Sequence, residues 1–318
     1  MQLFPLILLL AVSLFSQSPN VGPESGMPNL AQSPDGSVYL SWIDTLGAEG
    51  HALRYAKWSD GKWGEPETIA KGKGWFVNWA DFPALTVLTD GSMFAHWLTR
   101  YPEGGKYGYG IRIASKASGA NEWKQTHSMR LEEKDDYAGF LTFIPNAGGA
   151  IYLAPPLAPE DGHRKTVRFV SFSKDGSMAK DIELDADACS CCQTAVGRTS
   201  RGLIAAYRDH QPGEIRNIAI VRERDGVWSK PETLHADGWK INGCPTDGPS
   251  IATSGSDAAV MWLTRATDQP KVKAVLSRDG GLTFGSPIPM DDGNPAGRPS
   301  ITMLDTKSFL GVWLEKTS

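Results

Sequence analysis

The sequence lacks a long apolar run beyond its first residues, an excess of one charge and an amphipathic helical pattern. The apolar run from Leu3 to Phe15 is too short to span a bilayer comfortably, and no later stretch is apolar enough for a transmembrane helix. The net charge of −4 gives no basic surface for nucleic acid. These absences predict an all-β protein with no nucleic-acid partner and no stable membrane insertion.

The N-terminal segment has the features of a signal peptide except for the usual positive charge at its start. Ser16 and Ser18 stand at the −3 and −1 positions of a cleavage site behind the apolar run. No cysteine follows the run, so we expect no lipoprotein anchor. We therefore predict a signal peptide over residues 1–18 and a secreted or periplasmic mature chain, most simply a monomer, over residues 19–318.

One segment type recurs along the chain: a turn followed by an alternating apolar strand, as in GSVYLSWID and GSMFAHWLT. The strands align with spacings of 55, 56, 54, 55 and 51 residues. The aligned positions are Trp42, Trp97, Leu153, Tyr207, Trp262 and Trp313. Six copies at a near-constant interval indicate a repeat architecture.

Most copies have a short apolar strand before them and two further strands after them, and such a four-stranded unit is typical of a propeller blade. The spacing predicts a six-bladed β-propeller, with repeat units near 28–80, 81–136, 137–190, 191–245, 246–295 and 296–318. The sixth copy ends at Ser318 after its second strand, which predicts that the last blade is shortened or incomplete.

Asp-Gly turns stand between the third and fourth strands, as in SDGKW and RDGVW. One of them fills the Asp-box pattern, Ser-x-Asp-x-Gly-x-Thr-aromatic, with Ser277, Asp279, Gly281, Thr283 and Phe284. The chain therefore resembles the sialidase-like, Asp-box (BNR-repeat) propellers over nearly all of its mature length. Asp boxes are structural turns, so the resemblance implies an architecture and leaves the activity open.

Propeller topology places two classes of loop on one face, around the central channel: the loops before each first strand and those after each second strand. The residues on these loops predict a site for a carbohydrate or another small polar ligand. The candidate ligand-binding residues are Asp44, Asp81, Arg100, Tyr137, Arg208, Asp209, Asp247, Arg265 and Arg298.

All four cysteines fall within 56 residues, and both groups immediately precede first strands of neighbouring blades. We therefore expect Cys244 to lie close to the Cys-Ser-Cys-Cys segment. Disulfides are one interpretation, and a copper or zinc ion or reactive thiols are the alternatives, with His210 as the non-thiol ligand. The residues concerned are Cys189, Cys191, Cys192, Cys244 and His210.

If the protein is an enzyme, the resemblance implies a glycoside hydrolase of sialidase type. Such an enzyme uses an arginine cluster, a tyrosine nucleophile with a glutamate, and an aspartic acid. The candidates are Arg100, Arg208, Arg265, Arg298, Tyr207, Glu214, Asp44 and Asp81. The Arg-Ile-Pro motif of that family is missing, and the nearest segment reads Asp81-Phe82-Pro83. We therefore expect a non-hydrolytic glycan or small-ligand binding protein, with a soft-metal or thiol-redox protein and an exo-sialidase as the alternatives.

Overall fold

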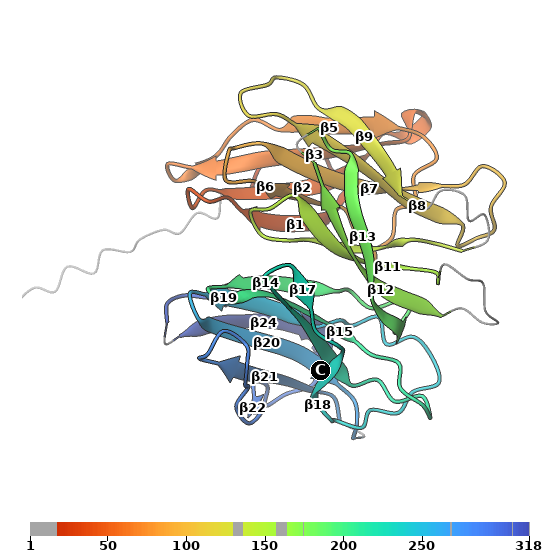
Figure 1. The fold of residues 1–318 in the computed structure, drawn as a ribbon. Coiled ribbons are helices and arrows are strands. Elements are labelled where there is room, and N and C mark those ends of the chain that lie inside the picture. Colours follow the sequence, from red (N-terminus) through yellow and green to blue (C-terminus); the bar gives the residue numbers. More distant parts are fainter. Residues whose placement is uncertain are drawn as a thin grey trace, which may run out of the picture.

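The computed structural model describes residues 18–129, 136–156, 164–173, 175–267, 269–306 and 308–317. Its elements are strands, apart from a short 3-10 helix η1 (Gly47–Glu49). The predicted signal peptide lies outside the described residues except for Ser18. Figure 1 shows the sheets from β1 to β13 in one half of the molecule and those from β14 to β24 in the other.

Consecutive strands pair antiparallel to form one sheet per repeat. Blade 1 contains β1 (Ser25–Gln32), β2 (Val38–Thr45), β3 (His51–Ser59), β4 (Lys62–Trp63) and β5 (Glu67–Gly72). Blade 2 contains β6 (Ala84–Val87), β7 (Met93–Arg100), β8 (Tyr109–Lys116) and β9 (Lys124–Met129). Blade 3 contains β10 (Gly139–Phe143), β11 (Gly149–Ala154), β12 (Lys165–Phe172) and β13 (Met178–Ala188).

The remaining strands follow the same order. Blade 4 contains β14 (Ala195–Thr199), β15 (Gly202–Arg208), β16 (Ile218–Arg224), β17 (Val227–Trp228) and β18 (Glu232–His235). Blade 5 contains β19 (Ser250–Ser254), β20 (Asp257–Thr264), β21 (Lys271–Ser277) and β22 (Ile288–Pro289). The last sheet has two strands, β23 (Pro295–Met303) and β24 (Phe309–Glu315). In blades 1 and 4, two short strands pair with different parts of the third strand and together replace the fourth.

The structure corrects the predicted blade number, because it has five blades instead of six. The sixth repeat supplies the two-stranded sheet β23–β24, and in the described chain β24 pairs with β23 alone. Its side chains Leu310, Val312 and Leu314 are all more than half exposed. The repeat spacing identified a sixth unit correctly, but two strands do not make a blade.

The repeat alignment itself is confirmed. The six aligned residues lie at the fifth or sixth position of the second strand of each sheet. The first five are buried, and Trp313 is half-buried on the two-stranded sheet. The indole N–H groups of Trp42 and Trp313 donate to the carboxylates of Asp44 and Glu315, at 2.8 and 2.7 Å. Such partners allow a tryptophan to be buried without an unsatisfied donor.

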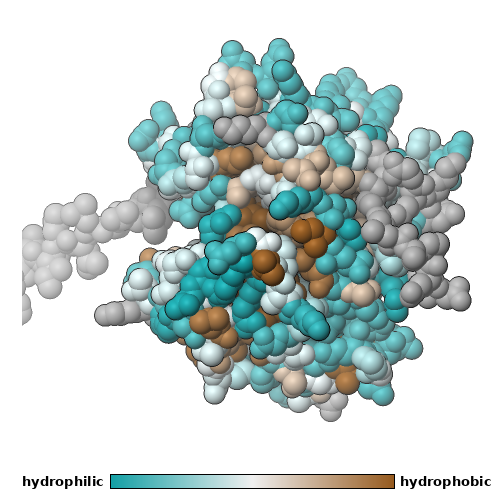
Figure 2. Space-filling model, in the orientation of Figure 1, coloured by the Kyte–Doolittle hydropathy of each residue, from teal (hydrophilic) through white to brown (hydrophobic). Residues whose placement is uncertain are grey.

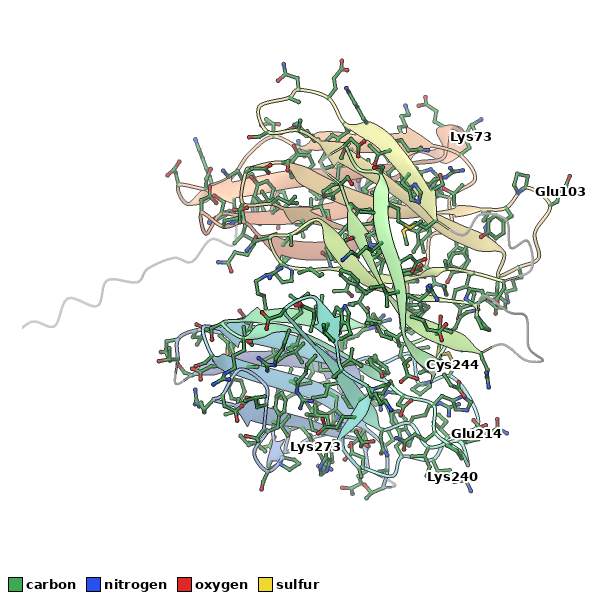
Figure 3. All side chains as sticks on the ribbon, in the orientation of Figure 1. Lys73, Glu103, Glu214, Lys240, Cys244 and Lys273 are labelled. Carbon is green, nitrogen blue, oxygen red and sulfur yellow. A yellow bond between two sulfur atoms is a disulfide. The ribbon has the colours of Figure 1, made fainter. Side chains whose placement is uncertain are left out.

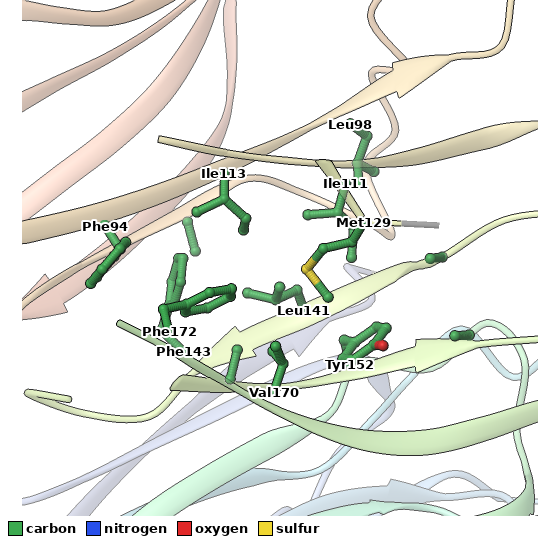
Figure 4. Packing of buried hydrophobic residues seen from close by; sticks show 14 of the residues in the cluster. Phe94, Leu98, Ile111, Ile113, Met129, Leu141, Phe143, Tyr152, Val170 and Phe172 are labelled. Atoms are coloured by element: carbon green, nitrogen blue, oxygen red, sulfur yellow. The ribbon is translucent and has the colours of Figure 1, made fainter. Parts of the chain in front are cut away.

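The core lies between the blades. Figure 4 shows the interface of blades 2 and 3, where Phe94 and Ile111 of one sheet face Leu141 and Phe172 of the other. Alternate residues of β7 and β11 belong to different clusters, so both faces of blades 2 and 3 pack against a neighbouring blade. The predicted Asp-Gly turns are present as well: Asp60 and Gly61 have φ values of 52° and 77°, as a tight hairpin requires.

His96 is an exception among these core residues. Its ring is completely buried beside Phe143, and neither ring nitrogen makes a well-aligned hydrogen bond within the described chain, although the Leu141 backbone interacts with the ring. Burial lowers the pKa of His96 to about 3, so the ring is neutral at physiological pH.

We expect His96→Leu to raise the free energy of unfolding by about 1–2 kcal/mol at pH 7, because it removes two buried unsatisfied nitrogens at similar volume. Urea unfolding of the two proteins measures this change. A lower midpoint for His96→Leu would show that the ring nitrogens are satisfied in solution.

Candidate functional site

Four chain segments meet at the centre of one face of the propeller, which we call the channel mouth. Gln193 connects three of them, because its Nε2 donates to the Ala80 carbonyl and its Oε1 accepts the N–H of Gly248 at 3.4 Å. Arg298 connects the fourth, since its Nη2 donates to the carbonyl of Trp79 at 3.1 Å. The loops before β6, β14 and β19 and the beginning of β23 therefore lie together.

Trp79 and Arg298 form the exposed part of the channel mouth. The Trp79 side chain is 58% exposed, and the Arg298 guanidinium lies 4.3 Å from the centre of its ring. The buried Asp247 carboxylate accepts the Arg298 N–H at 2.9 Å and so holds the backbone of β23 in place. An aromatic face beside a fixed cation is the arrangement that this mouth offers to a ligand.

Asp81 lies just below the channel mouth and joins blades 2 and 3. Its two oxygens accept the N–H of Phe140 at 2.8 Å and the hydroxyl of Tyr109 at 2.9 Å. Position 139 requires glycine, because a Cβ there would lie 2.0 Å from Oδ2 of Asp81. Burial raises the pKa of Asp81 to about 7, although both hydrogen bonds act in the opposite direction. The carboxyl therefore has a structural position and a pKa near neutrality.

Arg208 is buried, and its guanidinium holds three backbone segments together. It donates to the carbonyls of Asp247, Arg216 and Leu263 at 2.8, 2.8 and 2.7 Å. The ring of Trp239 lies 4.7 Å from the guanidinium carbon. Because its donors face protein carbonyls, Arg208 is not free to form a bidentate pair with the carboxylate of a substrate.

The structure confirms that Cys244 lies beside the Cys-Ser-Cys-Cys segment. Cys191 and Cys244 form a disulfide with Cα atoms 6.1 Å apart, and Cys189 and Cys192 are free and buried. The bond joins the loop before blade 4 to the loop before blade 5. Cys244 is labelled in Figure 3.

The two free thiols have opposite electrostatic environments. Burial raises the pKa of Cys189, but the hydrogen bond with Cys192 and the charges of Arg208 and Arg216 together bring it below its usual value. Burial and the neighbouring Cys189 raise the pKa of Cys192. The pair can therefore hold one negative charge more readily than two isolated buried thiols.

His210 belongs to a different group of side chains, on the loop after β15. Its Nδ1 and Nε2 lie 2.9 Å from Asp187 and 3.4 Å from Glu214. Glu214 also accepts from Arg216 at 2.7 Å, and these two hydrogen bonds lower the pKa of Glu214. Burial, followed by the charge of Asp185, raises the pKa of Asp209 on the same loop. The described side chains that lie close enough to share a metal ion beside these thiols are Cys189, Cys191 and Cys192, and His210 is not among them.

The other predicted residues are spread over the molecule. Within blade 1, Asp44 accepts from Ser25 at 2.6 Å and forms an ion pair with Arg54 at 2.7 Å. Arg100 donates to the Lys106 carbonyl at 2.9 Å. Arg265 donates to the Ala296 carbonyl at 3.4 Å. The contacts of these three side chains lie in different blades and do not form one cluster.

Tyr207 and Tyr137 both have fixed partners. The Tyr207 hydroxyl donates to Asp185 at 2.5 Å in a buried position. The Tyr137 hydroxyl donates to the carbonyl of Ser190, inside the cysteine segment. Tyr207 is therefore a packing residue, as its alignment with the core tryptophans suggested.

Sequence reasoning missed an aromatic stack that leads to the cysteine segment. The ring of Tyr109 lies 3.9 Å from that of Phe76 on one side and 4.8 Å from that of Tyr137 on the other. The fully buried Lys165 lies 4.1 Å from the centre of the Tyr137 ring and pairs with Asp136. These residues begin or precede strands of two neighbouring blades, and the repeat pattern carries no signal for their contact.

A groove of about 270 Å³ lies between blades 3 and 4. The turn from β10 to β11 and the hairpin of β16 and β17 line it, and its side chains include Phe169, Arg198 and Trp228. These hairpins are at the opposite ends of the strands from the channel-mouth loops.

Figure 2 shows a mostly hydrophilic surface with hydrophobic side chains gathered near the middle of the face in view.

The fold is that of a sialidase-like β-propeller. Among solved structures, a protein of unknown function from Dyadobacter fermentans is 14% identical with a TM-score of 0.58 and covers 91% of this chain and 89% of its own. The α-L-arabinofuranosidase Arb93A from Fusarium graminearum, with a bound iminosugar inhibitor, is 11% identical with a TM-score of 0.57 and covers 92% of this chain and 89% of its own.

A microbial sialidase, Hz136, is 13% identical with a TM-score of 0.50 and matches 92% of this chain. The chain spans 63% of the length of that sialidase. No protein-family model matches the chain, and no curated protein matches its sequence. At these identities the likeness establishes the fold alone. Within the described residues no helix is long and apolar enough to cross a membrane.

Proposed function

We propose that this protein is an exported propeller that binds a glycan or another small polar ligand at the channel mouth without hydrolysing it. The observation that carries the proposal is the exposed Trp79 ring beside the Arg298 guanidinium, where four segments converge. An apolar ring packs against the C–H face of a sugar, and a guanidinium donates to its hydroxyl or carboxylate oxygens. The predicted signal peptide and the disulfide support export.

The contacts of the catalytic candidates argue against hydrolysis. Each of the three nitrogens of Arg208 donates to a backbone carbonyl, Tyr207 donates to Asp185, and the buried Asp81 accepts two internal hydrogen bonds. A sialidase-type mechanism would need the same groups to be free and to converge on one sugar ring. Here they stabilise the junctions between blades.

We expect Trp79→Ala to weaken glycan binding by about tenfold or more, because a central exposed aromatic usually contributes 1–2 kcal/mol or more to such a contact. Calorimetric titration with methyl glycosides of neutral, uronic and sialic sugars measures the effect. Val227→Ala is the matched control, because Val227 is 70% exposed on a hairpin remote from the mouth. Binding that Trp79→Ala leaves unchanged would contradict the proposed site.

We also expect no release of sialic acid or arabinose from fluorogenic sialosides and arabinofuranosides. The reason is the missing arginine motif together with the internal bonding of Arg208 and Tyr207. Turnover by the wild-type protein that disappears in Arg265→Ala, which leaves only one long hydrogen bond unmade, would establish the hydrolase alternative instead.

A further inference from the structure

The cysteine segment contains two free thiols that the ligand-binding proposal does not use. Cys189 and Cys192 are 4% and 2% exposed, and their sulfur atoms lie within 4.8 Å of each other. Cys191, whose sulfur is 3.8 Å from that of Cys189, is already bonded to Cys244. Two thiols thus lie together beside a disulfide that fixes the loop carrying them.

The sulfurs of Cys189 and Cys192, which lie within 4.8 Å of each other, are close to the separation that one shared metal ion requires. A metal–sulfur bond for a closed-shell d¹⁰ ion is about 2.3 Å, so two sulfurs up to about 4.6 Å apart can bind the same ion in a nearly linear arrangement. Such low coordination suits Cu(I), a soft monovalent ion that prefers thiolates. Zinc requires four ligands, and the neighbouring candidates are occupied: Cys191 by its disulfide and His210 by Asp187 and Glu214.

The surrounding charges fit the same ion. Two thiolates and one Cu(I) carry a net charge of −1, and the buried guanidiniums of Arg208 and Arg216 act on Cys189. Within the described residues no carboxylate forms an ion pair with Arg208, whose three partners are carbonyls. Arg216 donates through Nη2 to Glu214 at 2.7 Å, while its Nε and Nη1 have no partner among the described residues. Arg208 is therefore the cation that would chiefly balance a buried anionic complex.

We propose that Cys189 and Cys192 bind one Cu(I) ion between them, beside the intact Cys191–Cys244 disulfide. On binding, each thiol loses its proton to solvent and forms one sulfur–copper bond. The copper stays monovalent, and no disulfide is made or broken. This site is independent of the glycan site, so either can fail without the other.

The test uses the full mature chain, purified without reductant. Thiol counting on the denatured protein should give two free thiols per chain. Titration with Cu(I), in competition with a chromogenic Cu(I) chelator, should give one ion per chain. Cys189→Ser and Cys192→Ser should each weaken this binding by roughly 100-fold or more. The double variant Cys191→Ser/Cys244→Ser is the matched control: it removes the disulfide that fixes the loop but keeps both thiols of the site, so it should still bind one Cu(I) per chain.

X-ray absorption of the copper-loaded wild-type protein keeps the proposal testable even if a variant fails to fold. Two sulfur neighbours at one distance would support it. Three or four sulfurs, or nitrogen and oxygen neighbours, would overturn it. Unchanged copper affinity in Cys189→Ser and Cys192→Ser would also overturn it, as would zinc binding that is preferred over Cu(I).

Discussion

Replacement of Arg208 by alanine is expected to lower the free energy of unfolding by about 5 kcal/mol or more. The variant would leave three buried carbonyls without their donors, at about 1–3 kcal/mol each, and a cavity beside Trp239. Whole domains are stable by only about 5–15 kcal/mol, so Arg208→Ala should unfold at a much lower urea concentration or fail to fold. Urea unfolding followed by tryptophan fluorescence measures the change.

Arg265→Ala is the matched control for this prediction, because Arg265 is half-buried and its hydrogen bond to the Ala296 carbonyl is long, at 3.4 Å. Its effect should stay below about 1 kcal/mol. This comparison distinguishes two roles for Arg208: a structural role and a role in clamping a ligand. A ligand-clamping arginine would lose binding on substitution and keep its stability, so an Arg208→Ala protein with a wild-type midpoint would contradict the structural role.

Asp81 is expected to make the protein less stable as the pH rises from about 4 to about 7. Its pKa is raised to about 7 in the folded state, from an ordinary value of 3.8. Below pH 4 the carboxyl is protonated in both the folded and the unfolded state, so it does not change the free energy of unfolding. Between the two pKa values the unfolded state ionises first, so stability falls, and above pH 7 the full cost of about 4 kcal/mol is present.

The measurement is the difference in unfolding free energy between wild type and Asp81→Asn, taken from pH 4 to pH 8. Taking this difference cancels the effect of His96 on the free energy of unfolding, which is the same in both proteins. That effect changes with pH in the direction opposite to the effect of Asp81. The pKa of His96 is lowered to about 3, so its contribution is lost as the pH falls below about 6.5. A difference between wild type and Asp81→Asn that does not change with pH would show that Asp81 titrates normally.

Part of the site could be predicted because loop positions follow from strand order. The positions of Cys244 and of the Cys-Ser-Cys-Cys segment, both directly before first strands, were enough to place them at one rim. Which vicinal cysteine pairs could not be predicted, because the choice between Cys191 and Cys192 depends on the path of the loop. His210 was assigned to the thiols for the same rim position, and its carboxylate partners could not be foreseen from spacing.

The sequence by itself determined the repeat, since alternation along a strand and Asp-Gly turns depend on residues close together in the chain. For this reason Trp42, Trp97 and Trp262 occupy matching places in their sheets. Only the tertiary structure decided which polar side chains are free at the channel mouth. Arg208 and Arg298 look alike in sequence, yet one is enclosed by three carbonyls and the other lies on an exposed ring. Their difference arises from loops of separate blades packing over one another, and no local pattern contains that contact.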